Sequence, residues 1–155
     1  MIPLTDIQEL AAPLVDAAAL IEVRLFESHA QHVEFPSHSG AIEASDIDVS
    51  VQSGSDDSTG MFVLRAESDM REVIENQEPR TVATFAVAFG ALYSFDDKLQ
   101  DEDGPALEAF GKCVATLTLW PYVRAEMSRL VDQMHLSASL TLPMLTQRDF
   151  IDKIN

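Results

Sequence analysis

The sequence of 155 residues contains a single cysteine, Cys113. An internal disulfide needs two cysteines, and a metal site of the Cys-x-x-Cys type needs at least as many. The sequence therefore excludes a disulfide framework and favours a reducing compartment. Stability must come from a hydrophobic core, for which a hydrophobic fraction of 46% is sufficient. The length indicates one domain.

Basic residues are scarce, with 10 lysines and arginines against 26 aspartates and glutamates, and the formal net charge is −16. Proteins that bind nucleic acid need cationic clusters that displace counterions from phosphates, and binding to an anionic membrane surface needs them too. We therefore expect no nucleic acid and no membrane as a partner. Basic polypeptides, or polypeptides of mixed charge, are the expected class. A role of the acidic charge in solubility alone is the alternative.

No apolar run reaches the length of about 18 residues that a membrane span needs. The first six residues contain no lysine or arginine, whereas a signal peptide begins with a basic stretch. We therefore expect neither membrane insertion nor an export signal, and a cytoplasmic location.

The sequence shows no group of residues at the spacing that a catalytic centre or a metal site requires. His29 and His32 lie three residues apart on a predicted strand, so they point to opposite faces and would not share a metal ion. The acidic loop 96–103 lacks the glycine and the terminal glutamate of an EF-hand. Cys113 lies among apolar residues of a predicted helix and is expected to be structural. We therefore expect no enzymatic activity and no cofactor.

Alternating apolar and polar residues predict four strands. These are residues 20–34, 41–53, 61–75 and 80–95. A bend or bulge is expected near Ser45, and an exposed loop at 53–60. The last strand is unusual because bulky residues at odd positions alternate with small residues at even positions. Both of its faces are therefore expected to be covered, one by a helix and the other by a second subunit or a loop.

Helical spacing of apolar residues appears at both ends of the chain. Residues 4–19 predict a short helix, capped by Thr5 and interrupted by Pro13, that forms an arm outside the core. A long helix begins at Gly104, and a kink at Pro121 would explain why its two apolar stripes differ in register. The first stripe consists of Leu107, Phe110, Val114 and Leu117. Thr146 is expected to cap a last short helix.

Strands followed by helices predict an α+β domain. We expect a four-stranded antiparallel sheet with the long kinked helix and the short C-terminal helix on one face. The N-terminal helical arm, residues 1–19, would precede this domain of residues 20–155.

Four segments resemble the SecB export chaperones and SecB-like proteins. The Trp-Pro-Tyr-Val-Arg sequence at residues 120–124 is similar to the family's aromatic-Pro-Tyr-x-Arg signature in the first long helix. Residues 90–95 resemble the end of the fourth strand, and residues 33–36 the end of the first. Residues 140–144 are similar to the apolar loop before the last helix. The order of predicted elements agrees along most of residues 20–154.

The resemblance implies a homotetramer, built as a dimer of dimers, that holds unfolded preproteins without ATP. It implies that clients bind in apolar grooves between the helix, the loop and the sheet. The residues expected to bind them are Tyr93, Phe95, Leu119, Trp120, Tyr122, Leu140, Leu142 and Met144. It also implies docking to the SecA motor through acidic residues on the sheet. Glu34 matches one such position, whereas Ala86 stands where the fourth strand should carry another acid.

Other functions stay open from the sequence. A SecB-like chaperone of a toxin–antitoxin system would bind an antitoxin, which fits a chain with few motor contacts. A hot-dog-like small-ligand binding protein or enzyme also packs a long helix on an antiparallel sheet, but its helix comes earlier in the chain. A structural interaction module would bind one partner selectively. An open apolar groove would favour a chaperone, and an enclosed polar pocket with a carboxylate would favour the hot-dog-like alternative.

Overall fold

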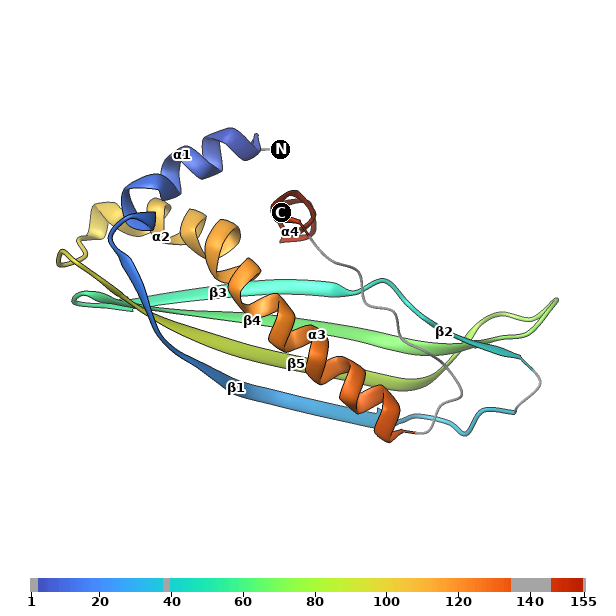
Figure 1. Ribbon diagram of the computed structural model, residues 1–155. Coiled ribbons are helices and arrows are strands. Elements are labelled where there is room, and N and C mark those ends of the chain that lie inside the picture. Colours follow the sequence, from blue (N-terminus) through green and yellow to red (C-terminus); the bar gives the residue numbers. More distant parts are fainter. Residues whose placement is uncertain (1–2, 38–39, 135–145, 155) are drawn as a thin grey trace.

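The computed structural model describes residues 3–37, 40–134 and 146–154 (Figure 1). In chain order the elements are α1 (Leu4–Val15), β1 (Ala18–His32), β2 (Ala41–Ala44), β3 (Asp48–Asp56), β4 (Thr59–Val73), β5 (Arg80–Phe95), η1 (Asp101–Asp103), α2 (Gly104–Phe110), η2 (Gly111–Ala115), α3 (Thr116–Gln133) and α4 (Gln147–Ile154). The strands form one antiparallel sheet with the helices on one face, which confirms the predicted α+β class.

The central strand of the sheet is β5, which pairs with β1 on one side and with β4 on the other. β4 also pairs with both β2 and β3, at different parts of its length. The predicted second strand is therefore two strands, and the predicted bend near Ser45 is confirmed. At this break the Asp69 amide donates a hydrogen bond to Ser45 Oγ at 3.0 Å, so the chain satisfies a backbone donor where the ladder is interrupted.

Both faces of β5 are covered, as its alternating large and small residues predict. On the outer face, away from the helices, Ala86 and Ala88 are 6% and 3% exposed. Side chains from the neighbouring strands supply the cover. Glu27 and Arg65 are the two cross-strand neighbours of Ala88, and they form an ion pair at 2.9 Å. Small residues on β5 therefore leave room for an ion pair that joins β1 to β4 across it.

The long helix changes register at η2, a π-helical turn between α2 and α3. A π turn holds more residues than an α turn, so the residues that follow are rotated about the helix axis. Val114 is consequently only partly buried and Leu117 is 38% exposed. The predicted first stripe was wrong beyond Phe110, and the register changes at η2 rather than at Pro121, which lies inside α3.

α1 packs against α2 and joins the core. Its buried residues are Ile7, Ala11 and Leu14. The predicted position outside the core was therefore wrong. The helix also begins one residue before Thr5, with Pro3 at the cap position, and it continues through Pro13. The division of the chain at residue 19 stays a prediction.

Candidate client-binding surface

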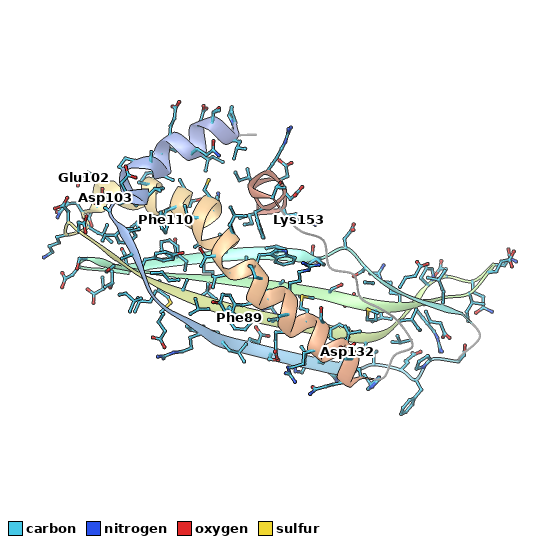
Figure 2. The ribbon with its side chains drawn as sticks, in the orientation of Figure 1. Phe89, Glu102, Asp103, Phe110, Asp132 and Lys153 are labelled. Carbon is cyan, nitrogen blue, oxygen red and sulfur yellow. The ribbon has the colours of Figure 1, made fainter. Side chains whose placement is uncertain are left out.

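Four of the predicted client-binding residues are buried in the single chain. Tyr93 and Phe95 are 4% and 5% exposed, because both rings pack edge-on against Phe110 from α2 (Figure 2). Leu119 and Trp120 are 0% and 3% exposed on the sheet-facing side of α3. These residues hold the helices on the sheet. As client-binding residues they stay predictions.

Tyr122 is the one predicted client-binding residue that the structure places at the surface, with 47% of its area exposed. Its ring lies 5.7 Å from that of Phe89, which projects from β5 towards α3 (Figure 2). Leu140, Leu142 and Met144 lie outside the described residues. Of the predicted residues that the structure describes, Tyr122 is at the surface and the other four are buried.

Two exposed leucines of β1 lie beside β5 residues that α3 contacts. Leu25 is the cross-strand neighbour of Phe89, and Leu20 is that of Tyr93. Both leucines are 47% exposed. We define Leu20, Leu25, Phe89 and Tyr122 as the α3–β1 surface. It presents apolar side chains from two strands, β1 and β5, and from the helix α3.

Hydrogen bonds fix α3 over this surface at both ends. Tyr93 Oη donates to Thr118 Oγ1 at 2.8 Å, and Ser28 Oγ donates to Glu126 Oε1 at 2.5 Å. Arg129 also pairs with Glu126. The hydrogen bonds from Arg129 and then Ser28 lower the pKa of Glu126 to about 2. The carboxylate is therefore charged at neutral pH and keeps α3 aligned with β1.

A surface hollow lies beside α3, apart from the α3–β1 surface. It has a volume of about 370 Å³ and is lined by Trp120, Pro121, Arg124, Ala125 and Ser128. Three of these residues belong to the segment that resembles the SecB signature. The signature therefore marks the position of a surface hollow as well as the core anchor Trp120.

Sequence reasoning missed the exposed apolar residues of β1. Besides the two leucines, Ile21 and Phe26 are 55% and 53% exposed. Register shifts between β1 and β5 occur at these two positions. The signal was present, because apolar residues at both odd and even positions between residues 20 and 26 cannot all lie on one face of a strand.

Glu34, the predicted motor-docking residue, belongs to a polar cluster just after β1. Arg80 pairs with Glu34 at 2.9 Å and also with Glu72 at 2.7 Å. Glu72 is 1% exposed, and it accepts hydrogen bonds from Ser37 Oγ at 2.7 Å and from the Ser37 amide at 3.0 Å. The cluster fastens the segment after β1 to the β4–β5 hairpin. It also holds Phe35 in place with 86% of its area exposed, because Arg80 donates to its carbonyl oxygen.

The Glu72 cluster predicts an acid-dependent loss of stability. The hydrogen bond from the Ser37 side chain, followed by that from Arg80, lowers the pKa of Glu72 from 4.5 to about 2. A lowered pKa in the folded state contributes stability above about pH 4.5, and this stability is lost as the pH falls towards 2. We expect the melting temperature of Glu72→Gln to fall less steeply than that of the unaltered protein between pH 5 and pH 2. Equal slopes in thermal unfolding followed by circular dichroism would contradict this assignment.

Other classes of site receive no support from the described residues. Within residues 3–37, 40–134 and 146–154, no group of three or more His, Cys, Asp and Glu side chains could hold a metal ion. The helices described by the structure include none long and apolar enough to cross a membrane.

The fold is similar to that of a solved structure. No protein-family model matches the sequence, and no significant match is found among curated proteins. The solved structure is that of the Mycobacterium tuberculosis SecB-like chaperone Rv1957 in complex with a ChAD peptide from the HigA1 antitoxin. The TM-score is 0.75 at 22% sequence identity, over 90% of this chain and 98% of that chain. The chain therefore has the fold of a SecB-like chaperone.

Proposed function

We propose that the protein is a holding chaperone of the SecB type, which binds unfolded polypeptides without ATP in the cytoplasm. The observation that carries this proposal is the α3–β1 surface. Leu20, Leu25 and Tyr122 are each 47% exposed on regular elements, and a contiguous exposed apolar patch is typical of a protein–protein interaction site. A net charge of −16 repels other loaded copies and keeps them apart in solution. The fold shared with a SecB-like chaperone supports the same function.

The hot-dog-like alternative fits the structure less well. That fold places its long helix among the first strands, whereas here α2 and α3 follow all five strands. The polar hollow on the outer face of the sheet, which includes Glu27 and Glu67, is open rather than enclosed. The carboxylates of Glu27 and Glu67 are already paired with Arg65.

Two client classes are compatible with this proposal. The neighbouring structure contains an antitoxin peptide, which favours an antitoxin client. Preproteins for export are the other class. Docking to SecA is a prediction, and a basic partner that binds Glu34 would have to compete with Arg80 at 2.9 Å. Affinity capture with the intact protein from its native cytoplasm, followed by identification of the bound polypeptides, distinguishes these clients.

The proposed function is tested by suppression of aggregation. The protein should suppress light scattering by a reduced, unfolded client at a stoichiometric ratio, and added ATP should have no effect. Serum albumin at the same concentration is the control. A protein that leaves the scattering unchanged at a severalfold excess would contradict the proposal.

We further propose a homotetramer, built as a dimer of dimers. Among the described residues only β5 pairs with β1, so one long edge of β1 is free, and an open apolar edge favours pairing with another copy. Sedimentation should give a mass about four times the chain mass of 17.1 kDa. Ile21→Lys, which places a charge on this edge, should shift the protein towards smaller species. A wild-type protein that sediments as a monomer would contradict this prediction.

A further inference from the structure

Within the part of the chain that the structure describes, no strand pairs with the second half of β3 on the side away from β4, which we call its free edge. Among the described residues, β3 pairs only with β4. Asp56 lies opposite Thr59 across a two-residue turn. The backbones of two residues in such a position are hydrogen-bonded to each other. Hydrogen-bonded and non-hydrogen-bonded pairs alternate along an antiparallel ladder. Val51, Ser53 and Ser55 therefore direct their N–H and C=O groups towards the free edge.

A contact from α4 supports this orientation of the backbone. By the same alternation, the carbonyl of Ile47 also points away from β4. Lys153 Nζ of α4 donates a hydrogen bond to that carbonyl oxygen at 3.1 Å. α4 thus covers the beginning of the edge, whereas Ser53 and Ser55 further along are exposed. The free part of the edge begins where α4 ends.

A hollow of about 680 Å³ lies beside this part of the edge. Val51 and Ser53 of β3 line one side, Gly104 and Pro105 of α2 line another, and Ile154 of α4 contributes from the end of that helix. A Cβ atom added at Gly104 would meet no atom within 4 Å, so that position leaves the hollow open. Because side chains alternate along a strand, a strand added to β3 would direct every second side chain into the hollow.

We propose that an extended segment of a polypeptide client adds to the free edge of β3 as a further strand, with alternate apolar side chains in this hollow. The inference rests on the proposed function and specifies where and how the backbone of a client is recognised. A row of outward N–H and C=O groups is complementary to another extended backbone and to little else. It therefore accepts many sequences, as a holding chaperone must.

The charges around the edge favour basic residues at the other positions of the segment. The outer side chains on the free part of β3 include the carboxylate of Asp56. Inside the hollow, Lys112 is already paired with Glu108 at 2.9 Å. An added strand would therefore place apolar residues in the hollow and lysines beside the carboxylate on the outer face of β3.

Ser53→Pro tests this site directly. Proline removes the outward N–H and is tolerated on an edge strand where that group faces solvent. Its ring also obstructs an approaching backbone. The probe is a fluorescein-labelled peptide of alternating valine and lysine, about ten residues long. Fluorescence anisotropy should show at least about a tenfold loss of affinity for Ser53→Pro and no loss for the control Ser53→Ala. Circular dichroism and thermal unfolding verify the fold of both variants.

A series of N-methylated peptides tests the same site without changing the protein. Methylation of alternate residues should abolish binding, whereas methylation of the residues between them should preserve it. Ser53→Pro with unchanged affinity, or a methylation series without a period of two, would overturn the strand-addition site. If the unaltered protein also suppresses client aggregation in that case, the proposed chaperone function stands and only this site is wrong. Failure to suppress aggregation would instead overturn the proposed function.

Discussion

Replacing Trp120 with alanine is expected to lower the free energy of unfolding by about 3–5 kcal/mol. The side chain is 3% exposed, and its ring packs edge-on against Phe150 of α4 with the centroids 5.6 Å apart. Phe150 is itself fully buried. Removing the indole leaves a cavity between α3 and α4 and loosens α4 from the sheet. Urea denaturation followed by circular dichroism measures the change.

Tyr122→Ala is the matched control for this measurement. Tyr122 lies two residues away on the same helix, but 47% of its area is exposed. Its truncation should cost about 1 kcal/mol or less, chiefly through the contact with Phe89. Equal losses for the two variants would contradict the assignment of Trp120 as a core anchor.

Tyr122→Glu is expected to have the largest effect on client binding. Aromatic residues at the centre of an apolar interface commonly account for 2 kcal/mol or more of binding energy, which corresponds to about a 30-fold loss of affinity. A glutamate at this position would also place a charge within the α3–β1 surface. The affinity for a reduced, carboxymethylated unfolded protein should fall by about this factor.

Tyr122→Phe keeps the ring and serves as the control for Tyr122→Glu. It should retain the affinity of the unaltered protein, because the contact with Phe89 involves the ring. Melting temperatures of both variants show whether the effect is confined to binding. A Tyr122→Glu variant that binds the unfolded protein as tightly as the control would exclude Tyr122 from the client-binding surface.

Much of the fold is predictable from local patterns in the sequence. The cap of α4 was predicted from Thr146, and the structure confirms it: Thr146 Oγ1 accepts a hydrogen bond from the Asp149 amide at 3.4 Å and donates one to Asp149 Oδ2 at 2.8 Å. The alternation along residues 80–95 correctly predicted that both faces of this strand are covered, although on the outer face side chains of β1 and β4 supply the cover rather than the predicted second subunit or loop. Such features depend on residues close in sequence, so composition and spacing suffice to find them.

The errors have physical causes that spacing does not reveal. The π turn at η2 rotates Leu117 to the surface, and nothing in the hydrophobic spacing separates this turn from a kink at Pro121. The apolar stripe of α1 shows that one face is buried, but not that α2 provides the contact. Likewise, the resemblance marked Leu119 and Tyr122 alike, although one is buried and the other exposed. Which apolar residues stay accessible depends on tertiary packing.

Photo-crosslinking from position 122 tests the central claim most directly. With p-benzoylphenylalanine in place of Tyr122, illumination in the presence of a reduced, unfolded client should link the client to the chaperone. The same group in place of Glu78, an exposed residue in the connection between β4 and β5, should give far less product. Crosslinks from position 122 that join only copies of this chain, with no client attached, would show that the α3–β1 surface is a subunit interface and would contradict the account.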